Sequence, residues 1–147
     1  MFQRELTAGW GDMDFNAHMR NTAYLDKAAD VRMLYFADRG FSTAEFARMR
    51  FGPVVRKDEL AYFREVGLME SLTVTLALGG LSGDGSHWIL RNEFFRGDGQ
   101  RAATVTSTGG WLDLAARRLV PPPAPVLDAM RALERTADFQ ELPNSVR

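Results

Sequence analysis

The sequence predicts an α+β fold in which an antiparallel β-sheet wraps around one long central α-helix. Two observations support this prediction. Residues 22–39 read TAYLDKAADVRMLYFADR without Gly or Pro, which favours a long helix. Four later segments are rich in β-branched, aromatic or leucine residues, and Gly-rich turns separate the last three of them. Tight turns between neighbouring strands are typical of an antiparallel meander, which would cover one side of the helix.

The first part of the chain predicts a strand, a polar loop and the long helix. Residues 2–10 partly alternate between apolar and polar side chains, as a strand does, and residues 11–20 are a loop dotted with Asp and Asn. Asn21 is a good N-cap for the helix that follows. Apolar residues occupy two adjacent stripes of that helix, so we expect it to be buried over much of its circumference. Gly40 is a natural stop.

The rest of the chain predicts a short helix, the four strands and a second short helix. Ser42 and Glu45 would cap a helix over residues 43–50. Residues 126–135 read as a terminal helix with Pro125 near its first turn. We expect the tail after about residue 136 to be loosely held. The predicted strands cover residues 54–64, 71–78, 87–95 and 102–114.

Composition limits the classes of function. The 147 residues suffice for one domain, 1–147, with a real core. The formal net charge of −1 argues against nucleic-acid binding driven by phosphate neutralisation. There is no cysteine, which fits a cytoplasmic location, and with two histidines a multi-histidine metal site is not expected. No apolar run is long enough for a membrane helix, so no membrane partner is expected.

The stretch from Trp10 to Arg32 concentrates the polar chemistry of the chain. It places Asp12, Asp14 and His18 just before the predicted helix. A helix N-terminus leaves backbone N–H groups unpaired and carries a partial positive charge, so a carboxylate beside it is placed to attack an acyl group or to activate water. No rival catalytic motif is present: the chain lacks a nucleophile elbow and both Gly-rich nucleotide-binding motifs.

This stretch resembles the acyl-CoA thioesterases of the hot-dog fold, in the 4-hydroxybenzoyl-CoA thioesterase-like family. That family carries D-x-D, a loop often reading H-V-N-N, an aromatic-leucine pair and Glu-x-Arg. The same spacing is filled here by Asp12-Met13-Asp14, His18-Met19-Arg20-Asn21, Tyr24-Leu25 and Asp30-Val31-Arg32. Residues 59–64 and 69–74 and the end of the last strand, 111–121, also match the family pattern. Arg20 replaces an Asn and Met69 a turn glycine, and both departures bear on the substrate class.

The resemblance implies roles for two residues, Asp14 and Asn21. Asp14 would be the catalytic carboxylate, acting as nucleophile or general base. The backbone N–H of Asn21 would donate a hydrogen bond to the developing oxyanion. From their positions beside Asp14 and on the helix, we also predict that His18 and Tyr24 contact the substrate. The alternatives are that His18 positions water, hydrogen-bonds the carboxylate or holds the loop, and that Tyr24 packs in the core. Asp12 is interpreted as structural.

The resulting hypothesis is a hydrolase that converts an acyl-CoA thioester to a free acid and coenzyme A. It would need no metal and no cofactor apart from the coenzyme A of its substrate. The family also implies a homodimer or a dimer of dimers, and a single sheet would otherwise leave a strand edge open. Two alternatives stay open: a non-catalytic hot-dog domain that binds an acyl thioester, and a hot-dog hydratase or dehydratase. The sequence leaves the acyl group and the carrier, coenzyme A or acyl-carrier protein, undetermined.

Overall fold

A computed structural model describes residues 1–144 of the chain, and its elements follow the predicted order. The helices are a short 3₁₀ turn η1 (Trp10–Asp12), α1 (Asn21–Asp38), α2 (Thr43–Met49) and α3 (Ala124–Arg131). The strands are β1 (Phe2–Thr7), β2 (Phe51–Tyr62), β3 (Ser71–Ser82), β4 (His87–Arg96), β5 (Arg101–Asp113), β6 (Arg118–Leu119) and β7 (Arg135–Leu142).

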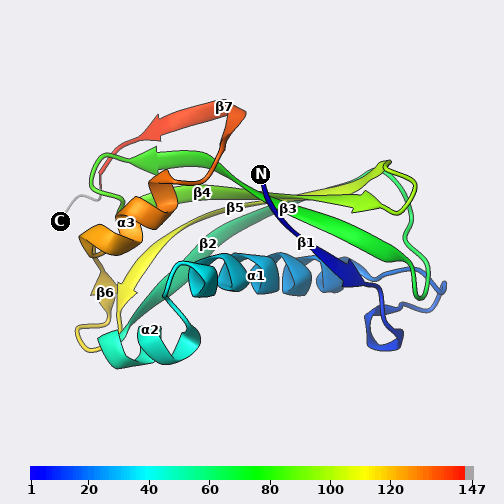
Figure 1. Cartoon of the computed structure of the whole chain (residues 1–147), viewed down its shortest axis with the longest axis horizontal. Helices are drawn as coiled ribbons and strands as arrows, with labels where there is room; N and C mark the ends of the chain where they lie inside the picture. The colour runs from blue at the N-terminus through cyan, green and yellow to red at the C-terminus, as the bar shows by residue number, and fades with distance from the viewer. Residues whose placement is uncertain (145–147) are drawn as a thin grey trace.

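One sheet with the order β1-β3-β4-β5-β2 curls around α1 (Figure 1). All neighbours along this path are antiparallel, and β3, β4 and β5 follow one another directly, as the turn signals predicted. Strand β6 adds to β5 at one end. The expected hot-dog arrangement, a curled antiparallel sheet with one long helix, is therefore confirmed. Strand β2 pairs only with β5 within the described residues, so its other edge is open.

The helix α1 packs on the concave face of the sheet through the stripe that its apolar residues predict. Ala28 and Val31 are fully buried, which lets the helix lie close to the strands. Towards its C-terminal half, Phe36 makes an edge-to-face contact with Trp111, which also stacks on Phe51. Burying rings of this size contributes about 1.5–3 kcal/mol each, and the cluster anchors that half of the helix to the sheet.

Local boundaries differ from the sequence predictions in two informative places. Helix α1 begins at Asn21, and the residue in the N-cap position is Arg20, whose backbone is extended and whose side chain makes no cap hydrogen bond. The prediction that Asn21 caps the helix was wrong by one residue. Strand β3 continues through Gly79 and Gly80 to Ser82, so the predicted turn is shorter than its Gly content suggested. By contrast, Ser42 caps α2 by accepting a hydrogen bond from the Glu45 N–H, as predicted.

The C-terminal segment is better ordered than we expected. Residues 135–142 form β7, which runs parallel to β3 and pairs with it on both sides of a register shift near Gly80. The prediction of a loosely held tail was wrong for this segment, while residues 145–147 lie outside the described part. Residues 135–142 show no clear strand alternation, and their pairing partner β3 lies far away in the sequence. Strand β7 therefore pairs with β3, as β1 does, and the edge of the sheet at β2 is unchanged (Figure 1).

Candidate active site

The loop before α1 is held by backbone hydrogen bonds at the end of the sheet. Met13 and Met19 form an antiparallel bridge that closes the loop on itself. His18 bridges to Gly67 in the connection from β2 to β3, and the Met19 N–H donates to the Val66 carbonyl at 2.7 Å. Two segments that lie far apart in the sequence are thereby joined beside the N-terminus of α1. The loop is thus a fixed platform for the polar residues it carries.

Asp12 is tied to the scaffold on two sides. Its Oδ2 accepts a hydrogen bond from the Gly9 N–H at 2.8 Å and lies 2.9 Å from the Nζ of Lys27 on α1. Partial burial acts to raise the pKa of Asp12, but the hydrogen bonds from Lys27 and Gly9 and the nearby positive charges outweigh it and lower the pKa below its usual value. These contacts match the structural role that we expected for this residue.

Asp14 lies on the surface of the same loop and keeps one carboxylate oxygen unengaged. Its Oδ1 accepts hydrogen bonds from the backbone N–H groups of Asn16, at 2.8 Å, and His18, at 3.2 Å. This local turn fixes the direction of the carboxylate. Oδ2 accepts no hydrogen bond from any group in residues 1–144. The carboxylate is therefore oriented by its backbone and still has an oxygen available for chemistry.

Asn21 presents its backbone at the start of α1. As the first residue of the helix it has no intrahelical acceptor, and its N–H donates to no group within the described part of the chain. Because no side chain caps the helix, this donor is not covered by Arg20. Arg20 instead donates from Nε to the Thr22 hydroxyl and from Nη1 to the Gly11 carbonyl. An unpaired N–H at a positive helix end is suited to a developing negative charge.

A pocket of about 370 Å³ opens at this end of α1. It lies between the start of the helix and the end of β2, and its lining residues are His18, Met19, Asn21, Tyr24, Tyr62, Phe63, Arg64 and Glu65. The structure thus brings together three of the four residues that we predicted for the site. The fourth, Asp14, does not line the pocket but is held by its hydrogen bond from the His18 N–H directly beside it.

Tyr24 combines the two roles that we considered for it. Its ring is almost fully buried and makes edge-to-face contacts with Tyr62 and Phe94 at centroid distances of 5.3 and 5.2 Å, so it packs in the core. It also forms part of the pocket wall. Burial raises the pKa of Tyr24 to about 12, and the negative charge of nearby Asp14 acts in the same direction. The hydroxyl therefore stays protonated at neutral pH.

The sequence analysis missed Glu65, whose carboxylate contacts His18 in the lining of the pocket. Glu65 Oε2 lies 3.1 Å from His18 Nε2, and both side chains are accessible to solvent. Glu65 follows the end of β2, and nothing in its sequence neighbourhood marks it as special. The pairing of His18 with Gly67 is what brings the two side chains together. The contact between Glu65 and His18 could be predicted only if the backbone bridge between His18 and Gly67 were already known.

Two cationic side chains, Arg64 and Arg101, lie in or near the pocket at the end of β2. Phe63 and Arg64 also line a wide surface hollow together with Gln100 and Arg101. Arg101 stacks over the Phe63 ring with its guanidinium carbon 4.5 Å from the centroid. Two other cations of β2, Arg56 and Lys57, lie instead beside His87 in a separate hollow of the surface. Of Arg56, Lys57 and Arg64, only Arg64 lines the pocket at the start of α1.

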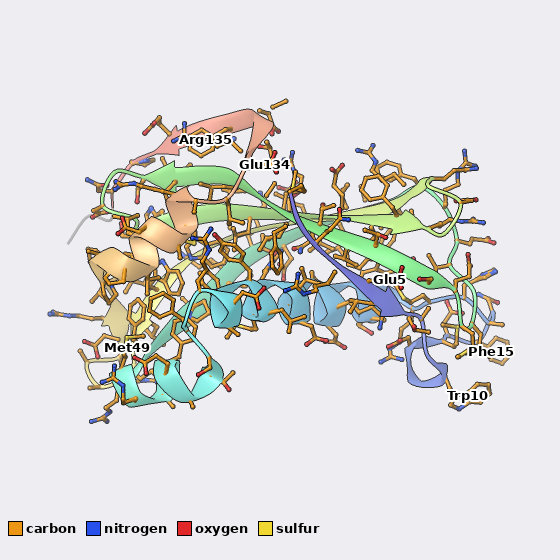
Figure 2. The ribbon with its side chains drawn as sticks, viewed as in Figure 1. Glu5, Trp10, Phe15, Met49, Glu134 and Arg135 are labelled. Carbon is orange, nitrogen blue, oxygen red and sulfur yellow. The ribbon has the colours of Figure 1, made fainter. Side chains whose placement is uncertain are left out.

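Exposed aromatic residues mark the outer surface of the same loop. Figure 2 shows Trp10 and Phe15 pointing away from the body of the protein at this end. Their side chains are 83% and 103% exposed, which is unusual for residues of this size.

No helix within residues 1–144 is long and apolar enough to cross a bilayer.

Comparisons with known proteins agree with this architecture. The model of a family described as the thioesterase-like superfamily matches residues 8–130 of the chain. No curated protein matches. Among solved structures, the hypothetical protein SAV2348 from Staphylococcus aureus, determined in complex with CoA, has a TM-score of 0.80 at 20% identity and covers 99% of this chain and 95% of its own.

Two further structures share the fold. A 1,4-dihydroxy-2-naphthoyl-CoA thioesterase from Synechocystis has a TM-score of 0.79 at 16% identity and covers 90% of this chain and 96% of its own. The probable thioesterase YbaW from Escherichia coli has a TM-score of 0.76 at 20% identity, with coverages of 92% and 100%. These likenesses support the fold, and the family match extends over most of the chain. The chain therefore belongs to the thioesterase-like superfamily.

Proposed function

We propose that this protein hydrolyses an acyl-CoA thioester at the pocket beside the start of α1. The observation that carries the proposal is the unpaired Asn21 N–H on the pocket wall, together with the carboxylate of Asp14 that the backbone of the pocket residue His18 holds in place. A carboxylate and a preorganised donor are the two groups that acyl transfer from a thioester needs. Membership of the thioesterase-like superfamily supports the same chemistry.

In the proposed reaction, the acyl carbonyl accepts a hydrogen bond from the Asn21 N–H. Asp14 then either attacks the carbonyl carbon itself or takes a proton from the water that attacks. A C–O bond forms and the C–S bond breaks, so coenzyme A leaves as a thiolate. On the water route the thiolate takes up the proton that Asp14 removed from water, and on the direct route it takes up a proton from solvent. On the direct route, water subsequently hydrolyses the acyl-aspartate intermediate and regenerates the carboxylate. His18 and Tyr24 would contact the acyl group from the wall of the pocket.

The cations beside the pocket suit the phosphates of coenzyme A. Arg64 and Arg101 line the hollow that continues from the pocket through Phe63, and guanidinium groups bind phosphate with paired hydrogen bonds. The names of the similar structures, one bound to CoA and one that acts on an aryl-CoA, support coenzyme A as the carrier.

A homodimer through β2 is part of the proposal. The free edge of β2 offers unpaired backbone groups along a strand that runs from Phe51 to Tyr62. Val55, Tyr62 and Phe63 expose about half of their apolar side chains along this edge. Pairing with a second copy would satisfy the backbone and cover these side chains. We place the protein in the cytoplasm, in keeping with its lack of cysteine.

A panel of acyl-CoAs tests the function and separates it from its rivals. Wild-type protein is incubated with short, long and aromatic acyl-CoAs, and free thiol is measured with a chromogenic reagent. Enzymatic thiol release from at least one thioester is expected. Saturable binding without thiol release would identify a binding domain and overturn the proposal. With crotonyl-CoA, loss of the enoyl absorbance without thiol release would instead identify a hydratase.

A further inference from the structure

A second cavity lies farther along α1, between the helix and the sheet. Its volume is about 210 Å³. Its residues come from the C-terminal half of α1 and from β2, β4 and β5: Ala29, Arg32, Met33, Phe36, Pro53, Val55, Trp88, Leu90 and Trp111. In the single chain Ala29, Pro53 and Val55 are exposed and form its mouth at the open edge of β2, which in the proposed homodimer faces the second copy. Trp88, Leu90 and Trp111 are buried and form its floor. Apart from the indole N–H groups of Trp88 and Trp111, all the lining side chains are apolar except one.

That exception is Arg32, whose guanidinium is buried with most of its donors unused. Only 8% of the residue is exposed. Nε donates to Asn92 Oδ1 at 2.9 Å, and the Asn92 amide is fixed in turn by donating to the Thr75 carbonyl at 3.0 Å. Nη2 is buried and donates to no group among the described residues, and no hydrogen bond engages Nη1 there. Burying donors without acceptors costs about 1–3 kcal/mol each, more when they are charged.

No carboxylate of the described chain forms an ion pair with Arg32. Burial lowers the pKa of Arg32 to about 10, so the group is still charged at neutral pH, and the charge of Asp58 acts in the opposite direction. Asp58 lies on β2 and its Oδ1 already accepts a hydrogen bond from the buried hydroxyl of Ser107. Asp58 lies beyond ion-pair distance of Arg32. No other acid among residues 1–144 shifts the pKa of this guanidinium. The cation therefore lacks a direct counter-ion.

We propose that this cavity binds a small organic carboxylate, with its apolar body among Phe36, Trp88 and Trp111 and its carboxylate on the free donors of Arg32. A guanidinium with free Nη donors pairs well with a carboxylate. An apolar cavity of about 150 Å³ holds a benzene molecule, so the volume here accommodates a six-membered ring with one substituent. The ligand class is therefore a monocarboxylic acid of about this size.

This site is separate from the pocket at Asn21 along the same helix. Eleven residues separate Asn21 from Arg32, which at a rise of about 1.5 Å per residue places their backbones about 16 Å apart. Carboxylate binding at Arg32 therefore does not depend on the proposed hydrolysis. Free carboxylic acids are, however, the chemical class of product that a thioesterase releases. The cavity would let the protein bind such an acid at a place other than the pocket at Asn21.

Calorimetry with two matched probes tests the site directly. Cyclohexanecarboxylate and its uncharged amide have nearly the same shape, and neither needs to be a substrate. Wild-type protein should bind the carboxylate at least tenfold more tightly than the amide, and Arg32→Met should lose this preference. Ala29→Leu places a larger side chain at the exposed mouth without touching the charge, and it should weaken carboxylate binding at least fivefold. Ala37→Leu, at an exposed position of α1 outside the cavity, should bind like wild type.

The outcomes separate the proposal from its rivals. Equal affinities for the two probes, or carboxylate binding that Ala29→Leu leaves unchanged, would overturn it. Failure of wild type to bind the carboxylate would overturn it as well, including the case in which a second copy of the chain fills the cavity at all concentrations. Circular dichroism shows whether Arg32→Met folds, and Ala29→Leu provides an independent test if it does not. Because the readout is binding, it is unaffected by whether the protein hydrolyses acyl-CoA.

Discussion

The two cavities along α1 are built in opposite ways. The pocket at Asn21 lies at the end of the sheet, where a loop, a helix N-terminus and the end of β2 contribute polar and backbone groups. The cavity at Arg32 lies within the aromatic cluster that anchors the helix, and Arg32 is its one charged residue. The first offers free donors and carboxylates for chemistry, whereas the second offers shape and one fixed charge. A single helix thus contributes to a polar pocket suited to catalysis at its N-terminus and to an apolar cavity suited to ligand binding farther along.

Removing a ring from each cavity should have very different effects on folding. Trp111→Ala takes away a fully buried ring and is expected to lower the free energy of unfolding by about 3–5 kcal/mol. Tyr62→Ala removes a half-exposed ring and is expected to cost about 1 kcal/mol. Urea denaturation followed by circular dichroism measures both values. Similar losses for the two variants would contradict the contrast between surface pocket and core cavity.

The backbone donor at Asn21 can be removed without breaking the helix. Proline lacks the N–H and is well tolerated at the first helical position, and the extended backbone of Arg20 (φ −73°, ψ 155°) suits the residue before a proline. Asn21→Pro is therefore expected to lower kcat for thioester hydrolysis about 10²–10³-fold, the usual cost of losing one oxyanion donor.

Asn21→Ala is the matched control, because it removes the side chain and keeps the N–H. Its kcat should stay close to that of wild type. Both variants should retain the helical circular dichroism and melting temperature of wild type. If Asn21→Pro hydrolyses the thioester as fast as Asn21→Ala, the backbone of Asn21 is not the oxyanion donor.

The pairing of Glu65 with His18 should have a smaller effect. Glu65→Gln removes the charge that faces the imidazole, and for an accessible pair we expect a decrease in kcat/KM of about fivefold, equivalent to about 1 kcal/mol. Glu59→Gln, at an exposed position of β2 outside the pocket, is the control. A Glu65→Gln variant with the kcat/KM of wild type would show that the pair does not position His18 for the substrate.

The scaffold role of Asp12 predicts the smallest effect, and one that depends on pH. The pKa of Asp12 is lower in the folded protein than its usual value of 3.8, so the ion pair with Lys27 stabilises the fold above that pH and is lost as the pH falls through the folded pKa. Asp12→Asn should lower the free energy of unfolding at pH 7 by about 1 kcal/mol or less. The difference should shrink progressively in urea denaturation as the pH is lowered below 3.8. A difference that does not shrink with pH would exclude the ion pair as its cause.

Much of the fold was predictable because its signals are local. The uninterrupted run of α1, the Ser42 cap and the glycine turns between β3, β4 and β5 each act over a few residues. The platform that carries Asp14 and His18 was also predictable in position, since its spacing resembles that of a known family. The structure shows His18, Asn21 and Tyr24 on one pocket wall, in agreement with that spacing.

What escaped prediction depends on contacts between distant residues. Glu65 meets His18 only because the loop bridges to Gly67, and Arg32 meets Asn92 only because α1 crosses β4. Strand β7 escaped because it has no clear alternation and its pairing to β3 depends on a parallel partner far away in the chain. Neither residue composition nor periodicity carries such information, because both describe neighbours along the chain.

The central claim is that Asp14 acts on the thioester, and one substitution tests it most directly. Asp14→Asn keeps the size of the side chain and an oxygen that can accept the N–H groups of Asn16 and His18, while it removes the charge. Using the best thioester of the acyl-CoA panel, we predict that kcat falls about 10²–10⁴-fold with an unchanged melting temperature, whereas Asp26→Asn, an exposed position on α1, behaves like wild type. An Asp14→Asn variant that hydrolyses the thioester at the wild-type rate would contradict the account.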